Sequence, residues 1–328
     1  MQHWRALMAV VLMSAAGMVA GEVAGQSYSA YPAKSVKLIM PFPAGGPTDI
    51  VGRLVAQRLA EVWGQTVVID NRPGGGGLIG GTLAAKSPPD GYTLYLGGIT
   101  TLVLSTFVHK HMPYDPQRDF QPVSQITLSP LLLMVHPGLP TPDVQAFIAL
   151  ARARPGEINY ATSGPGGSGH LAGELFRLVT KTKLVHVPYR GAPPALNDLV
   201  AGQVQSAFGS MLAAVPHIRN GKIRALAVTG PKRSSALPEV PTFAEAGLVN
   251  FDASTWNGIL VPMGTPHAIV ERIHGDLAKI MRTPNVLERL SADGAMPMSS
   301  TPAAFAAFIK TEGVKWGAVV REANIRIE

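Results

Sequence analysis

Two short segments combine glycines with hydroxyl-bearing residues where an apolar run gives way to a helical pattern. The first loop, residues 41–49, reads PFPAGGPTD, and the second loop, residues 161–170, reads ATSGPGGSGH. Glycines let a backbone approach a bound molecule closely, and the first amides of a helix attract anions. Either segment alone is equally compatible with a capped turn. Together they predict recognition of one acidic ligand by two loops.

A third glycine-rich segment, residues 71–80, contains a G-x-G-x-x-G match at Gly75, Gly77 and Gly80. A dinucleotide site also needs an acidic residue at the end of a second strand, and none is evident. The segment also lacks the Gly-Lys-Ser/Thr of a phosphate-binding loop. We therefore interpret it as a structural turn with close helix packing, and we predict no cofactor.

Residues 166–170, GGSGH, resemble the G-x-S-x-G elbow of serine hydrolases, but His170 stands where the last glycine belongs. On a helix His170 would also point away from Ser168, because side chains two positions apart do not meet. The nine histidines include no H-E-x-x-H motif, and there is no cysteine. We predict neither a metal site nor an enzyme; a serine hydrolase is the remaining catalytic alternative.

The elements that must position these loops alternate between apolar strands and amphipathic helices. An apolar strand at 36–42 precedes a helix at 50–63, with Thr48 as its N-cap and Gly64 as its stop. A strand at 158–161 precedes a helix that starts near Ser168. This rhythm predicts an α/β fold with mainly parallel sheets flanked by helices. Further strands are expected at 66–69, 93–96, 131–135, 184–187, 204–208 and 223–228, and further helices at 78–86, after Thr141-Pro142, Thr265-Pro266 and Thr283-Pro284, and at 305–320.

Two extended, proline-flanked segments, 119–130 and 252–262, are interpreted as crossings between two domains. Domain 1 would then be discontinuous, comprising 31–125 plus 255–328, with domain 2 at 126–254 and the ligand cleft between them. Two such connections form a hinge.

The N-terminus has the pattern of a secretory signal peptide within residues 1–25. His3 and Arg5 precede an apolar run at 6–20, followed by small residues. Because the run is shorter than the roughly 20 apolar residues that span a bilayer, an uncleaved anchor is the weaker alternative. We expect a protein exported to the periplasm.

The composition of the 328 residues favours a folded protein. Hydrophobic residues make up 46% and charged residues 15%, which is typical of a chain with a sizeable core. The net charge is +7, but the basic residues are scattered and do not alternate with aromatic ones, so we exclude nucleic acid as a partner.

Many short motifs, in one order from Tyr31 to the C-terminus, are similar to those of the tripartite tricarboxylate transporter receptors, also called Bug proteins. The resemblance implies a two-domain Venus-flytrap fold of the type II periplasmic binding class, a monomer, and integral-membrane permease subunits as partners. It also implies that the ligand's carboxylate is held by backbone amides, hydroxyls and waters rather than by an arginine clamp. The motifs include YP at 31–32, the first loop, NRPG at 71–74, PDGYTL at 89–94, SGHLAGEL at 168–175, HVPYRG at 186–191, RALAVT at 224–229, LPEVPT at 237–242 and GTP at 264–266.

The resemblance extends the candidate site beyond the two loops, to the end of a third strand near residues 97–100 and to residues 189–192 and 208–210. The predicted ligand-binding residues are Phe42, Ala44, Gly45, Gly46, Thr48, Asp49, Gly98, Thr100, Thr162, Gly164, Gly166, Ser168, His170, Tyr189, Gly191, Ala192 and Gly209.

Three departures from the family's pattern leave the ligand open. Gly209 stands where relatives often carry an acidic or amide residue, the usual Ser-Trp-Phe-Gly is Thr-Trp-Asn-Gly at 255–258, and the second loop has Gly-Pro-Gly-Gly-Ser. Dicarboxylates, tricarboxylates, amino acids and aromatic acids all remain candidates. A periplasmic sensor that uses the same pocket is a further alternative.

Overall fold

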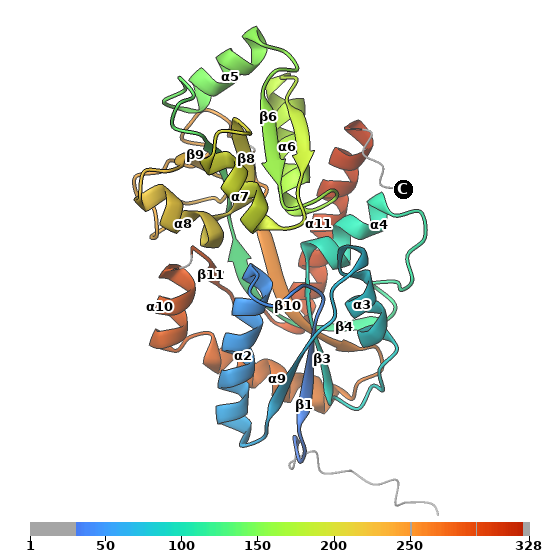
Figure 1. The fold of residues 1–328 in the computed structure, drawn as a ribbon. Helices are drawn as coiled ribbons and strands as arrows, with labels where there is room; N and C mark the ends of the chain where they lie inside the picture. Colours follow the sequence, from blue (N-terminus) through green and yellow to red (C-terminus); the bar gives the residue numbers. More distant parts are fainter. Residues whose placement is uncertain (1–30, 250, 293, 324–328) are drawn as a thin grey trace, which may run out of the picture. The chain divides into compact units, whose positions relative to one another are not determined.

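Two β-sheets organise the protein (Figure 1). The computed structural model describes residues 31–249, 251–292 and 294–323, so the predicted signal peptide lies outside the described residues. The first sheet has the order β11-β4-β10-β3-β1-β2, and the second has the order β7-β6-β8-β5-β9. The strands are β1 (Val36–Met40), β2 (Val67–Asn71), β3 (Thr93–Gly98), β4 (Phe120–Ser129), β5 (Leu131–Val135), β6 (Asn159–Thr162), β7 (Val185–Pro188), β8 (Ser206–Ser210), β9 (Arg224–Val228), β10 (Thr255–Pro262) and β11 (Met296–Pro297).

Both sheets are mixed: most strands run in one direction, as predicted, and antiparallel strands are inserted among them. Strands β2, β1 and β3 run parallel, whereas β10 and β4 pair antiparallel in the same sheet. In the second sheet β7, β6 and β8 run parallel, whereas β5 is antiparallel to both β8 and β9. A strand buried on both faces has the same apolar run in either direction, so the pattern predicted the strands but not which of them run antiparallel.

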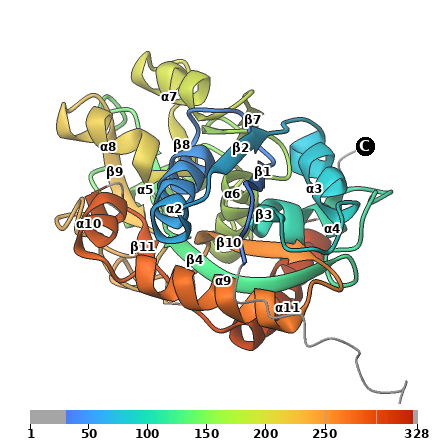
Figure 2. The same ribbon diagram turned by 90° about the horizontal axis from the view of Figure 1, so that it is seen from below.

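Helices follow most strands and pack against the sheets (Figures 1 and 2). Helix α2 packs against β1, β2 and α9, and α6 packs against β6, β7 and β8. The C-terminal helix α11 contacts both β4 of the first sheet and α6 beside the second. The helices are α2 (Pro47–Trp63), α3 (Leu78–Ala85), α4 (Ser105–Val108), α5 (Val144–Ala153), α6 (Ser168–Thr180), α7 (Ala192–Val200), α8 (Met211–Arg219), α9 (His267–Ile280), α10 (Pro284–Ala292) and α11 (Pro302–Glu322), with a 3₁₀ turn η2 (Gly75–Gly77) and a π-helical turn η3 (Thr100–Leu104).

Several helices begin elsewhere than predicted; α11, for example, starts at Pro302 instead of at residue 305. Helix α2 has Gly46 at its N-cap and Pro47 in its first turn, so Thr48 lies inside the helix and does not cap it. Proline is favoured there because its fixed φ suits a helix start and its missing N–H leaves no unpaired donor. Helix α5 is capped by Asp143, whose side chain accepts a hydrogen bond from Ala146 N–H, instead of by Thr141.

The glycine-rich segment after β2 is a turn with close helix packing, as predicted. Gly75 and Gly76 both have positive φ, which only glycine adopts without strain. A Cβ on Gly80 would lie 2.9 Å from the Cα of Pro41, so α3 sits directly against the start of the first loop. The turn thus supports the first loop from behind.

A large apolar cluster forms the core and combines residues of both sheets and their helices, among them the fully buried Phe208 of β8, Trp256 of β10, Phe176 of α6 and Trp316 of α11. Burial of apolar surface is the main stabilising contribution to such a fold. Among the described helices, none combines the length and apolar character needed to cross a bilayer.

Candidate functional site

The parallel strands of each sheet end at one edge, and helices start there without side-chain caps. In the first sheet β1 leads through the first loop into α2; in the second sheet β6, β7 and β8 lead into α6, α7 and α8. None of these four helices has a side-chain hydrogen bond at its N-cap, whereas α5 and α11 do. Because the first amides of a helix have no intrahelical acceptor, these uncapped starts can bind an anion.

The first loop is held by the buried carboxylate of Asp49. Its Oδ2 accepts hydrogen bonds from Gly45 N–H at 2.9 Å and from Arg53 Nε at 2.7 Å, and its Oδ1 accepts one from Asn71 Nδ2 at 2.9 Å. Asn71, at the end of β2, also donates to the carbonyl of Phe42 at 3.0 Å. The polar atoms of Asp49 therefore organise the loop.

These contacts also set the charge of Asp49. Burial of the carboxyl opposes its ionisation, but the hydrogen bonds from Arg53, Gly45 and Asn71 outweigh that effect and lower the pKa of Asp49. The carboxylate is consequently ionised at neutral and mildly acidic pH.

The second loop repeats the geometry of the first. Gly166 has φ 69° and Gly167, the N-cap of α6, has φ −78° and ψ 170°; the corresponding Gly45 has φ 81° and Gly46 has φ −80° and ψ 170°. Gly166 N–H donates to His170 Nδ1 at 3.0 Å, as Gly45 N–H donates to Asp49. One loop is thus closed by a carboxylate and the other by an imidazole.

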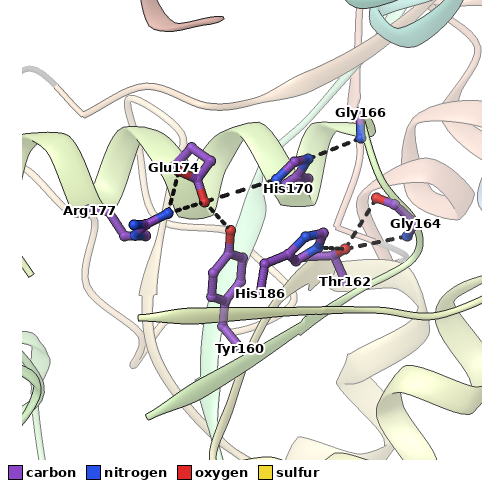
Figure 3. A network of polar contacts seen from close by, with 8 residues as sticks. All are labelled: Tyr160, Thr162, Gly164, Gly166, His170, Glu174, Arg177 and His186. Atoms are coloured by element: carbon purple, nitrogen blue, oxygen red, sulfur yellow. Dashed lines mark hydrogen bonds and ion pairs between the residues drawn. The ribbon is translucent and has the colours of Figure 1, made fainter. Parts of the chain in front are cut away.

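Behind the second loop lies a network of buried polar side chains (Figure 3). The His170 ring stacks on His186 of β7, with ring centroids 3.9 Å apart and planes 7° from parallel. His186 Nε2 lies 2.7 Å from the Oγ1 of Thr162, at the end of β6. Further along α6, Glu174 accepts hydrogen bonds from Tyr160 Oη at 2.6 Å and from Arg177 Nη1 at 2.6 and 2.7 Å.

Both stacked imidazoles are neutral at neutral pH. Burial, the neighbouring His170 and the Arg177 guanidinium lower the pKa of His186 to about 3. Burial is also the main reason that the pKa of His170 is lowered; Glu174 opposes that shift and Arg177 adds to it. A protonated ring in this stack would place a charge in a poorly hydrated site.

We expect the stability of the protein to fall in mild acid because of this pair. Below pH 6.5 the unfolded chain binds more protons on these histidines than the folded chain does, so stability is full at neutral pH and decreases as the pH drops. For His186 alone, with a folded pKa of about 3, the loss is about 2 kcal/mol at pH 5. Urea denaturation at pH 7.5 and pH 5 measures it.

The His186→Phe variant provides the control for that prediction, since phenylalanine keeps a stacked ring but cannot titrate. Between pH 7.5 and pH 5, the free energy of unfolding of this variant should fall by about 2 kcal/mol less than that of the wild type. A variant of the exposed His267 should keep the wild-type dependence. If wild type and His186→Phe gave the same pH dependence, the buried pair would not be the cause.

The remaining predicted residues of the second sheet lie at the same edge as the second loop. Tyr189 N–H donates to the Thr162 carbonyl at 3.0 Å and Gly191 N–H donates to the Ser163 carbonyl at 3.1 Å, so the turn from β7 to α7 is tied to the loop. Ala192 begins α7, and Gly209 lies near the end of β8, where it pairs with Leu132.

The predicted polar residues fall into two groups. Asp49, Thr162, His170 and Tyr189 use their side chains in hydrogen bonds within the protein; Tyr189 Oη donates to Asp198 at 2.6 Å. In contrast, Thr48, Thr100 and Ser168 are partly exposed, and within the described residues their hydroxyls have no hydrogen-bond partner. These three hydroxyls are free to bind a ligand, together with the loop amides of Ala44 and Gly46, whereas Gly164 N–H donates to Thr162 Oγ1 at 3.3 Å.

Gly98 has a different setting. It is buried in β3 opposite Asn257 of β10, and a Cβ on it would lie 2.6 Å from the carbonyl oxygen of Trp256. Close strand packing explains its lack of a side chain.

Sequence reasoning missed the residues that hold the loops from behind, namely Arg53, Asn71, His186 and Glu174. One local signal was present: Asp49 and His170 are each followed four positions later by a side chain of opposite or complementary charge, Arg53 and Glu174. Such pairs lie on one helix face. The contributions of Asn71 and His186 come from neighbouring strands and have no local signal.

Comparison with known proteins agrees with this architecture. Residues 51–325 match the family model of the tripartite tricarboxylate transporter family receptor. The chain is 38% identical to Protein BugT of Bordetella pertussis over 310 residues, which cover 94% of this chain and 95% of BugT. The structure of R. palustris Rpa4515 with adipate has a TM-score of 0.85 at 38% identity and covers 90% of this chain and 100% of that one.

A second solved structure, MatC (Rpa3494) from Rhodopseudomonas palustris with bound malate, has a TM-score of 0.79 at 32% identity and covers 88% of this chain and 100% of MatC. Together with other structures of periplasmic binding proteins, these likenesses confirm the predicted two-domain α/β fold of that class. The resemblance seen in the sequence motifs is confirmed as well, and the chain belongs to the tripartite tricarboxylate transporter family of receptors.

Proposed function

We propose that this protein is a periplasmic receptor that binds a small carboxylated metabolite and presents it to integral-membrane permease subunits. On this proposal the signal peptide at 1–25 is cleaved and the receptor is a monomer. Its domain 1 comprises 31–125 plus 255–328, its domain 2 comprises 126–254, and the ligand is held in the cleft between them.

One observation carries the proposal: each sheet presents a loop of the same geometry that leads into a helix without a side-chain cap. The first sheet contributes the free hydroxyls of Thr48, at the start of α2, and of Thr100, after β3; the second sheet contributes that of Ser168, at the start of α6. Backbone amides and hydroxyls at helix starts bind carboxylates through hydrogen bonds and the helix dipole. The adipate and malate named for the relatives Rpa4515 and MatC support a carboxylate as the ligand class.

The same geometry supports a binding protein in preference to a hydrolase. Ser168 would need a histidine as general base. The Nδ1 of His170 accepts the Gly166 amide hydrogen, and its Nε2 lies on the side of Glu174, 3.9 Å from Oε1. We therefore propose that the protein has no enzymatic activity.

A panel of organic acids tests the function by thermal and chemical denaturation at pH 7.5. A ligand at 100 times its Kd should raise the free energy of unfolding by about 2.7 kcal/mol. The panel should contain malate, adipate, a tricarboxylate, an amino acid and an aromatic acid, with the diamide of adipate as a neutral control. Stabilisation by an acid but not by the diamide supports the proposal. If protein freed of ligand by unfolding and refolding responds to no acid, the carboxylate assignment is wrong.

A further inference from the structure

We propose that His170 is a positioning residue rather than a ligand contact, and that the second loop holds its ligand-binding shape only while His170 Nδ1 is unprotonated. The inference rests on the proposed function, because it assigns a part in ligand capture to a residue of that site. It predicts a receptor whose two loops respond differently to mild acid.

The ring of His170 is committed to the loop through Nδ1, and its other polar atom, Nε2, lies on the side of Glu174, 3.9 Å from Oε1. Its Nδ1 accepts the hydrogen of Gly166 N–H, so the ring proton of the neutral form is on Nε2, which faces Glu174. One face of the ring is covered by His186, and the side chain is only 12% exposed. Its position matches that of Asp49 in the first loop, which also engages its polar atoms within the protein.

Protonation of His170 would remove the acceptor on which the loop depends. A proton on Nδ1 would point at the hydrogen of Gly166 N–H, and two donors cannot form a hydrogen bond. The stack with His186 leaves the ring no free direction on that side. Gly166, with φ 69°, and the adjoining N-cap Gly167 would then have to move, and they form the turn that presents the start of α6.

The groups around His170 are defined on every side. Glu174 and Arg177 lie on its own helix, Tyr160 comes from β6, and His186 comes from β7. Strand β8 contributes the apolar Phe208, which packs against Tyr160 and Phe176. On α11, which packs against α6, Lys315 pairs with Glu312 and Asp252. Glu174 favours the imidazolium, but it is already paired with Arg177, and burial and Arg177 oppose the charge.

The first loop should not respond in the same pH range. The acceptor of its Gly45 N–H is the ionised carboxylate of Asp49, whose pKa lies below the usual value of a carboxyl group. Because an acidic side chain with a lowered pKa keeps its charge well below pH 5, Gly45 stays bound to Asp49 when His170 begins to take up a proton. Mild acid therefore loosens one loop and leaves the other intact.

The hydrogen bond from Gly166 N–H to His170 Nδ1 can be tested directly by ¹⁵N NMR of the ligand-free protein between pH 7.5 and pH 5. The Gly166 amide resonance should shift with the titration of the His170 ring nitrogens, while the Gly45 amide resonance stays constant. In the His170→Asn variant, whose side-chain oxygen can accept the same hydrogen bond but does not titrate, the Gly166 shift should be absent. A Gly166 resonance that does not follow His170 would overturn the inference, whichever ligand the protein binds.

Calorimetric titration with adipate then tests the consequence for binding. Between pH 7.5 and pH 5, wild-type affinity should fall about tenfold more than that of His170→Asn, which is the loss expected for one hydrogen bond to the loop. The ligand's own ionisation is common to both proteins and cancels. Parallel pH profiles, or tighter wild-type binding in acid, would contradict the inference, the latter because the imidazolium would then attract the acid directly. If adipate does not bind at pH 7.5, that acid is excluded as ligand and the NMR result decides alone.

Discussion

Replacing Glu312 with alanine should lower the free energy of unfolding by about 3–5 kcal/mol, the cost of breaking a buried charged network by removing one partner. Its side chain is 6% exposed on α11, and Oε2 accepts hydrogen bonds from the indole Nε1 atoms of Trp256 and Trp316, each at 3.1 Å. Oε1 lies 2.7 Å from Lys315 Nζ. Without the carboxylate, two buried indole donors and a half-buried ammonium would lose their acceptor at once.

The destabilisation caused by Glu312→Ala should also extend to the elements around α11, because this helix contacts both β4 and α6. Urea denaturation followed by tryptophan fluorescence measures the change, since two of the four tryptophans donate to the carboxylate. Glu61→Ala is the matched control: its pair with Arg58 lies on the surface, where ion pairs contribute little. Equal losses in both variants would show that the indole contacts do not stabilise the protein.

The Gly169→Ala variant should impair both stability and ligand binding. A Cβ on Gly169 would lie 2.5 Å from the carbonyl oxygen of Phe208, a backbone atom of β8 that cannot rotate away. Overpacking of this kind costs about 3 kcal/mol, whereas alanine is favoured over glycine within a helix by only about 1 kcal/mol. A net loss of about 2 kcal/mol is therefore expected, with α6 displaced from β8.

Ser168 and the second loop are at the start of α6, so the displacement of this helix should also weaken ligand binding. For an acid found to stabilise the wild type, the affinity should fall at least about tenfold, equivalent to about 1.4 kcal/mol. Gly167→Ala is the control. Its φ of −78° is open to alanine, and the nearest atom to its Cβ, the Gly164 carbonyl oxygen, is 3.6 Å away. Both variants can be compared by denaturation and calorimetry. If Gly169→Ala bound the ligand as tightly as Gly167→Ala does, the contact with β8 would not position the loop.

Most of the secondary structure around the two sheets was predictable, because it is encoded in short-range sequence patterns. The apolar run at 131–135 became β5 over the same residues, and the helix predicted near Ser168 starts there. The errors occurred where two local signals compete. At α2 the sequence Gly-Gly-Pro-Thr offers both Gly46 and Thr48 as N-cap, and the fixed φ of Pro47 favours the earlier start.

Most strands and helices, the two glycine-rich loops and, through the motifs, the family could be predicted from the amino-acid sequence, but helices α7 and α8 and strand β11 were not. These features could be predicted because backbone preferences, apolar periodicity and the spacing within each motif are all properties of neighbouring residues. The directions of β5 and β10, and the loop atoms that are left for a ligand, follow from contacts between segments far apart in the chain. Asp49 and His170 have the chemistry of ligand contacts, yet they close the loops, because Asn71 and His186 reach them from adjacent strands. Hydrogen bonds and ring stacks between segments far apart in the chain depend on which strands lie side by side, and local patterns do not record that.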